Sequence, residues 1–160
     1  MKRPHQKPPK IQFTKEGYAK VQKEHDELKE KRKIAVQELA TASAMGDRSE
    51  NAAYKVGRQK LSGIDRQIRH TAMLLRFGVV TEREFTGKVD IGCNATIDNG
   101  KETKEYSIVG GYESDLATGK ISCFSPIGKA LMHKKVDDIV HVPVPAGTLV
   151  LTIKEVALSL

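Results

Sequence analysis

The sequence has no tryptophan, four tyrosines, four phenylalanines and only two cysteines among its 160 residues. Cys93 and Cys123 form no CxxC motif, so we expect two small buried side chains in a reducing compartment. No stretch approaches the about 18 apolar residues of a membrane span. The first ten residues are basic and proline-rich and lack the apolar run of a secretory signal. We therefore expect a cytoplasmic protein with no membrane association.

Motifs of self-contained enzymes are missing as well. The five histidines are scattered without metal-ligand spacing, and the sequence contains no GxSxG, Walker loop, HExxH or dinucleotide fingerprint. We do not expect an enzyme that carries a complete catalytic site of its own.

Charge is divided unevenly along the chain. Residues 1–80 contain 18 Lys/Arg against 9 Asp/Glu, and residues 81–160 contain 9 against 11, so the halves carry about +9 and −2 of the net +7. A field of this sign favours a polyanion or an acidic protein surface, and salt screens much of the attraction. Charge alone would also permit a nonspecific nucleic-acid-binding protein. Such a protein would bind RNA on its own, with a steep salt dependence.

The basic half carries two helical patterns on either side of the hexapeptide at residues 46–51, GDRSEN. Upstream, positions spaced alternately by three and four form a coiled-coil seam that two polar residues interrupt: Tyr18, Val21, His25, Leu28, Arg32, Ala35, Leu39 and Ala42. Downstream, the same spacing recurs at Tyr54, Gly57, Leu61, Ile64, Ile68, Thr71 and Leu75. Two such segments joined by a short break predict an antiparallel hairpin. An arm of about 28 residues would hold the hexapeptide about 40 Å from the base of the hairpin.

Capping residues predict where these helices begin and end. Thr14 is the expected N-cap of the first helix, with Gly17 a poor helix former in its first turn, and this helix should run to about Ala44. The second helix should begin near Ser49 and end before Gly78, which would serve as its C′ residue.

After residue 78 the pattern changes to short β-like runs, at residues 88–91, 94–97, 105–109, 120–124, 139–144 and 148–156. Asp98-Asn99-Gly100 predicts a type I′ hairpin turn. Ser125 as N-cap and Pro126 at N1 predict a short helix. The predicted fold class is α+β: a disordered basic tail over residues 1–12, a helical hairpin over 13–77, and a small antiparallel sheet domain with one short helix over 78–160.

Asp47 and Glu50 in the hexapeptide have two interpretations. In a capping box, Asp47 accepts from the amide three residues on and Glu50 reaches back to the cap amide. In a divalent-cation site, the two carboxylates suit Mg²⁺, which keeps several waters and needs few protein ligands. Two carboxylates make an incomplete site, so the other ligands would come from another molecule. The two interpretations are not exclusive.

The chain resembles the bacterial transcript-cleavage factors of the GreA/GreB family. The resemblance covers the chain from about Phe13 to its end. It rests on residues 45–54 (MGDRSENAAY), Leu61 with 64–66 (IDR), 106–110 (YSIVG), 121–122 (IS), 125–131 (SPIGKAL) and 145–147 (PAG).

In that family a coiled-coil hairpin enters the secondary channel of RNA polymerase, and an FKBP-like C-terminal domain docks on the rim coiled coil of the β′ subunit. The resemblance implies that Asp47 and Glu50, supported by Ser49 and Asn51, help the polymerase hold its second Mg²⁺ and cut backtracked RNA near the 3′ end. The residues expected to contact that RNA are Arg48, Lys55, Arg58, Arg66 and Arg69. The residues expected to dock on the polymerase are Ser125, Pro126 and Ile127.

Two features depart from the family pattern, and two alternatives remain open. Family tips often carry a third acid where this chain has Ala53, and the basic N-terminal extension is not part of the usual plan. One alternative is a Gre-like factor that occupies the channel and inhibits cleavage, against which the intact acids argue. The other is a peptidyl-prolyl isomerase. The C-terminal half argues against it, because it has few aromatic residues from which to form a proline-binding pocket.

Overall fold

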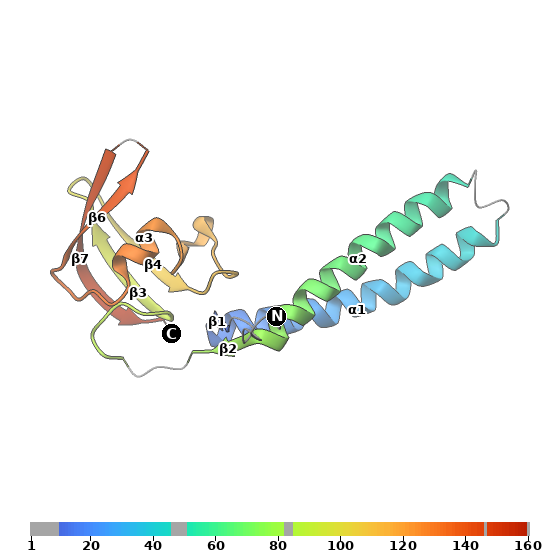
Figure 1. Cartoon of the computed structure of the whole chain (residues 1–160), viewed down its shortest axis with the longest axis horizontal. Coiled ribbons are helices and arrows are strands. Elements are labelled where there is room, and N and C mark those ends of the chain that lie inside the picture. The colour runs from blue at the N-terminus through green and yellow to red at the C-terminus, as the bar shows by residue number, and fades with distance from the viewer. Residues whose placement is uncertain (1–9, 46–50, 82–84, 146, 160) are drawn as a thin grey trace, which may run out of the picture. The chain divides into compact units, whose positions relative to one another are not determined.

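The computed structural model describes residues 10–45, 51–81, 85–145 and 147–159. They form two compact units, one from Tyr18 to Phe77 and one that combines the chain up to Gly17 with the chain from Gly78 onward. The first unit is a pair of helices, and the second contains the sheets and a short helix (Figure 1). The predicted α+β class is confirmed. Residues 1–9 of the predicted basic tail lie outside the described residues, whereas Ile11 and Gln12, also assigned to that tail, belong to a strand.

The two helices of the first unit are α1, Lys15–Ser43, and α2, Ala52–Phe77. They lie side by side and run antiparallel, as the predicted hairpin requires (Figure 1). The Tyr18 hydroxyl near the start of α1 donates to the Leu75 carbonyl near the end of α2, at 3.2 Å. The side chains buried along the pair are mostly members of the predicted seam: Val21, His25, Leu28, Ala35, Ala42, Thr71 and Leu74.

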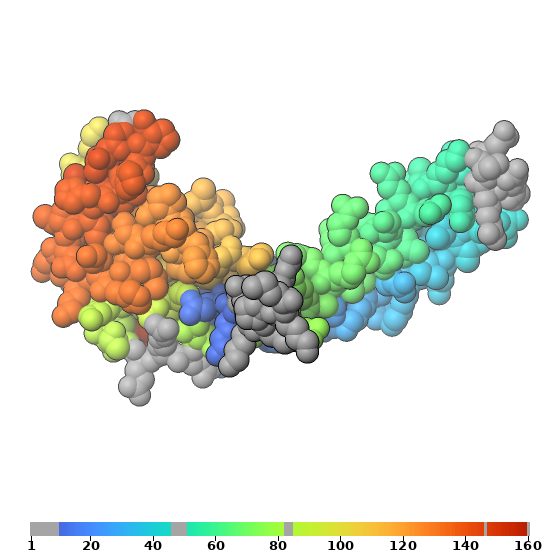
Figure 2. Space-filling model, viewed as in Figure 1, coloured from blue at the N-terminus to red at the C-terminus, as the bar shows by residue number. Residues whose placement is uncertain are grey.

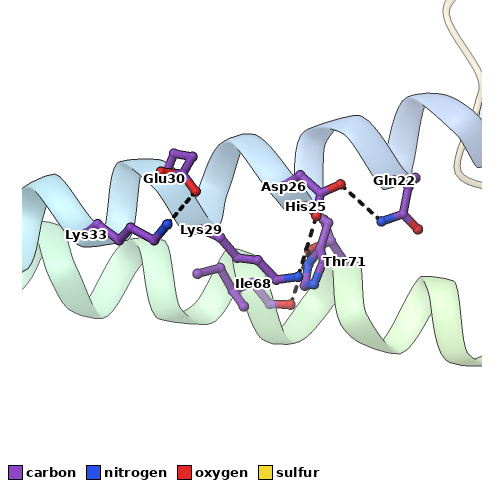
Figure 3. Close-up of polar contacts among 8 residues, drawn as sticks. All are labelled: Gln22, His25, Asp26, Lys29, Glu30, Lys33, Ile68 and Thr71. Carbon is purple, nitrogen blue, oxygen red and sulfur yellow. Dashed lines mark hydrogen bonds and ion pairs between the residues drawn. The ribbon is translucent and has the colours of Figure 1, made fainter.

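The two polar interruptions of the seam are accommodated in different ways. His25 is buried, and its Nδ1 lies 2.8 Å from the Thr71 hydroxyl oxygen (Figure 3). The Thr71 hydroxyl also lies within hydrogen-bonding distance of the Gln67 and Ile68 carbonyls, at 3.1 and 3.2 Å, so the buried polar atoms are paired. Arg32, expected in the seam, is exposed instead. Its charged guanidinium stays at the rim, where Nε pairs with Asp65 of α2 at 2.7 Å.

The second unit begins with a two-stranded parallel ribbon. Strand β1, Ile11–Phe13, pairs with β2, Gly78–Val80, in the register Ile11 to Gly78 and Phe13 to Val80. Gly78 therefore does not serve as a left-handed C′ residue of α2, and its φ is not positive. That prediction is wrong because the chain passes from the last helical residue straight into strand pairing.

Thr14 caps α1 as predicted, with its Oγ1 accepting from the Gly17 amide at 3.0 Å. A capping box also needs an acid at the third helical position, which here is Gly17. Glu113, 99 residues away, takes that role: its Oε1 accepts from the Thr14 amide at 2.9 Å and from the Gly110 amide at 3.2 Å, and its Oε2 accepts from the Thr14 hydroxyl. A Cβ at position 17 would overlap the Glu113 carboxylate. The glycine is thus what lets a distant acid complete the cap.

The main sheet has five strands in the order β5-β4-β3-β7-β6. They are β3, Cys93–Asp98; β4, Thr103–Val109; β5, Lys120–Ser122; β6, Ile139–Val144; and β7, Gly147–Leu158. All neighbouring pairs are antiparallel except β4 and β5, which are parallel. The predicted all-antiparallel sheet is wrong for β5, because the link through the 3₁₀ helix η1, Leu116–Thr118, returns the chain to Ser107, from where β5 runs in the same direction as the end of β4.

The short helix α3, Pro126–Leu131, packs on this sheet (Figure 1). Leu131 of α3 belongs to the core, whose largest fully buried members also include Ile108, Val142 and Ile153. The run at 88–91 forms no strand. It makes one bridge, Lys88 to Lys135, while Val89 and Ile91 contribute to the core.

The link between β3 and β4 differs from the predicted type I′ turn. It spans four residues, and of these only Gly100 has a positive φ, of 80°. The Asn99 Oδ1 accepts from the amides of Lys101 and Glu102, each at 2.9 Å. Asparagine acts here through its side chain and not through a left-handed backbone.

Candidate functional site at the distal end of the helical hairpin

The predicted tip lies between the end of α1 at Ser43 and the start of α2 at Ala52. Asp47, Glu50, Arg48 and Ser49 lie outside the described residues, so their capping and metal roles stay predictions. Asn51 is described. The described part of α2 begins three residues later than the predicted start near Ser49, and Asn51 is its N-cap.

Asn51 bonds to both helices. Its Oδ1 accepts from the Tyr54 amide at 3.0 Å, and its backbone carbonyl accepts from the Lys55 amide at 3.1 Å, so it caps the start of α2. Its Nδ2 donates to the Ala42 carbonyl at 2.8 Å. Ala42 lies in the last turn of α1, and its carbonyl also accepts from the Met45 amide at 3.2 Å. One side chain therefore bonds to both helix ends at the base of the tip.

Small residues shape the hairpin next to this contact. Gly57 lies against Leu39, whose Cδ1 would be 3.2 Å from a Cβ at position 57. A groove between the helices is lined by Glu38, Ala42, Ala52, Ala53, Val56, Gly57 and Lys60. The Glu38 carboxylate and the Lys60 ammonium meet across it at 2.6 Å. Ala53 adds no carboxylate here, so Asp47 and Glu50 are the only acids of the tip sequence.

Four predicted RNA-contacting residues lie along one exposed face of α2. Lys55, Arg58, Arg66 and Arg69 are all exposed. At 3.6 residues per turn, their spacing confines them to a sector of about 80° and a length of about 21 Å. Within the described part of the chain none of the four has an ion-pair partner, whereas Lys60 is paired with Glu38. These four side chains, called the α2 basic stripe below, are available to an external polyanion.

The predicted docking residues lie at the start of α3. Ser125 is the N-cap, and its Oγ accepts from the Gly128 amide at 3.0 Å. Pro126 is exposed, while Ile127 is half-buried and packs against the core. In Figure 2 the α3 segment (orange) lies on the surface of its unit. Of the three residues, only Pro126 is in the exposed class, and Phe124 close to it is 62% exposed, a feature that the sequence pattern did not reveal.

Other candidate sites among the described residues are poor. A pocket near α3 is lined by Ile97, Asn99, Glu102, Lys104, Tyr106, Ile127, Leu149 and Leu151, of which only Tyr106 is aromatic. No group of three or more His, Cys, Asp or Glu side chains in the described segments could hold a metal ion. Both cysteines are buried, and burial raises the pKa of the Cys123 thiol. None of the described helices is both long and apolar enough to cross a membrane.

Comparison with known proteins covers both units. The family model for the N-terminal domain of transcription elongation factors matches residues 11–77, and the model "Transcription elongation factor, GreA/GreB, C-term" matches residues 84–158. The chain is 41% identical over 143 residues to transcription elongation factor GreA of Neorickettsia sennetsu, covering 86% of this chain and 90% of that protein. It is 41% identical over 146 residues to GreA of Trichlorobacter lovleyi, with the same coverage. Among solved structures, GreA factor homolog 1 (Gfh1) of Thermus thermophilus is 23% identical with a TM-score of 0.45, covering 92% of this chain and 99% of that one.

Proposed function

We propose, from the premise that this chain belongs to the GreA/GreB family of transcription elongation factors, that it binds bacterial RNA polymerase and stimulates cleavage of backtracked RNA. In this proposal the hairpin tip enters the secondary channel, the C-terminal unit docks on the β′ rim coiled coil, and the polymerase active site cuts the RNA. The observation that carries the proposal is the family match over both units, together with the two acids in the segment that joins the helices.

The dimensions of the hairpin suit entry into a narrow channel. The 29 residues of α1 span about 43 Å, and each helix is about 10–12 Å across with its side chains. Near the distal end Gly57 lies against Leu39, and the other residues that line the groove between the helices include three alanines. The chain can therefore carry two carboxylates deep into another protein while its sheet unit stays outside.

Mg²⁺ would be held by Asp47 and Glu50 jointly with groups of the polymerase. The tip sequence offers two carboxylates, which make an incomplete site, so the remaining ligands would come from the polymerase. When bound, such an ion stabilises the attacking and leaving oxygens of a phosphodiester. The contribution of this chain is to place the two carboxylates, and cleavage chemistry remains with the polymerase.

The α2 basic stripe would hold the 3′ segment of RNA that backtracking extrudes. Its four cations lack ion-pair partners among the described residues and lie on one face of the helix that leads away from the tip. Arg48 in the tip sequence would extend this surface. Contacts of this kind are with phosphates, so they position the RNA without reading its sequence.

The test is a halted polymerase complex whose RNA carries a label at its 3′ end. We expect the wild-type factor to release short labelled fragments when Mg²⁺ is present. Asp47→Ala and Glu50→Ala should abolish this release while still competing with the wild-type factor for polymerase, because the carboxylates act on the transition state and the sheet unit supplies most of the affinity. A factor that competes for polymerase but never shortens the RNA would be the inhibitor alternative, and the proposal would be wrong.

A further inference from the structure

The contacts of Asn51 point to a role beyond helix capping, and we propose that Asn51 is a positioning residue that clamps the end of α1 to the start of α2, the two ends between which Asp47 and Glu50 lie in the sequence. The inference rests on the proposed function, because it concerns the efficiency of the same tip. In this inference Asn51 acts indirectly, by holding the ends of the two helices together. It does not need to contact RNA or metal.

The geometry separates two functions within one side chain. The Oδ1 acceptor bonds to the Tyr54 amide at 3.0 Å within α2, which is the ordinary work of an N-cap. The Nδ2 donor bonds to the Ala42 carbonyl at 2.8 Å, nine residues back in the sequence and on the other helix. The Met45 amide also donates to this carbonyl, at 3.2 Å. Of these three bonds, only the one from Nδ2 joins the start of α2 to the end of α1.

The cross-helix bond closes the chain between Ala42 and Asn51 into a loop with a fixed base. Asp47 and Glu50 lie inside that loop in the sequence. Fixing the ends of a short loop reduces the number of conformations open to the residues within it. Groups that act on a transition state are more effective when their arrangement is set beforehand, because less ordering is left for the reaction step. The clamp should therefore affect the rate of cleavage more than the binding of the factor.

Two substitutions isolate the clamp from the cap. Asn51→Asp keeps an acceptor for the Tyr54 amide but places a carboxylate oxygen against the Ala42 carbonyl, so the cross-helix bond is lost. Asn51→Ser also keeps a good N-cap, is neutral, and has a hydroxyl too short to replace Nδ2. Using both removes the ambiguity that a new charge near the tip would create. Asn51→Ala, which loses cap and clamp together, is the matched control for loss of helix stability.

We expect Asn51→Asp and Asn51→Ser to lower the cleavage rate at saturating factor about five- to tenfold, the effect of one lost hydrogen bond, with polymerase affinity nearly unchanged and the unfolding temperature lowered less than in Asn51→Ala. Asn51→Ala should show the same loss of rate and a lower unfolding temperature. A wild-type rate in both capped variants, or a loss that appears as weaker binding and disappears at saturation, would overturn the clamp.

A second measurement does not depend on cleavage. Spin labels at the exposed positions Thr41 and Ala52 report the distance between the helix ends in the full-length chain. Both capped variants should broaden the distance distribution relative to the protein with Asn51. An unchanged distribution would overturn the clamp even if the rates fall. If the parent protein stimulates no cleavage at all, the proposed function fails, and this measurement still decides whether the clamp exists.

Discussion

Gly17→Ala should destabilise the sheet unit although alanine is the better helix former. A Cβ at position 17 would occupy the space of the Glu113 carboxylate, which bonds to the Thr14 amide, the Thr14 hydroxyl and the Gly110 amide. The overlapping atoms are the end of a flexible side chain, so we expect Glu113 to swing into solvent and not the backbone to shift. The cost is then the loss of these hydrogen bonds.

The magnitude follows from two opposing effects. A hydrogen bond to a charged group contributes about 1.5–3 kcal/mol, and the half-buried position of Glu113 places its bonds with Thr14 at the lower end, so losing them costs about 3 kcal/mol in total. Alanine in place of glycine stabilises the helix by at most about 1 kcal/mol, because its helix propensity is higher. The net loss of about 2 kcal/mol should lower the unfolding temperature of a unit of this size by roughly 10 °C.

The matched control is Gly63→Ala in α2, where a Cβ would meet no atom within 4 Å. It should stabilise the hairpin by up to about 1 kcal/mol. Urea unfolding, followed through amide NMR signals of Ile97 and Ile153 in the sheet, measures the effect of Gly17→Ala. In a Glu113→Ala background the space is free, and Gly17→Ala should become neutral or stabilising. If Gly17→Ala stabilised the wild-type protein as Gly63→Ala does, the distant capping box would be refuted.

Two further predictions concern the polymerase complex. Reversing Arg58, Arg66 and Arg69 to Glu should lower cleavage most in deeply backtracked complexes, because longer extruded RNA makes more contacts with the α2 basic stripe; an equal loss at every backtracking distance would indicate a folding or docking defect. At Ser125, which caps α3, Ser125→Asp should keep the cap and weaken polymerase binding, while Ser125→Ala should cost about 1 kcal/mol of stability and leave binding nearly intact. Binding by competition and thermal unfolding separate the two, and unchanged affinity in Ser125→Asp would remove this segment from the interface.

Features that depend on neighbouring residues could be predicted from the sequence. The three-and-four spacing gave the helical hairpin, Thr14 and Ser125 were found as N-caps, and strand β6 has the predicted bounds. Each of these follows from contacts within a few residues or from one apolar face. The parallel strand β5 and the strand pairing of Gly78 could not be found in this way, because both depend on partners that are distant along the chain.

The tip shows why local signals were insufficient there. Asp47, Ser49 and Asn51 are all good N-cap residues, so sequence alone could not choose among them as the start of α2. Asn51 differs from the other two in carrying both an acceptor and an NH₂ donor that reaches beyond its own helix. The Ala42 carbonyl, at the end of the other helix, makes use of that donor. An N-cap residue that must also donate a hydrogen bond to the end of the preceding antiparallel helix is therefore better served by asparagine than by aspartate or serine. This preference becomes visible only when the two helix ends are considered together.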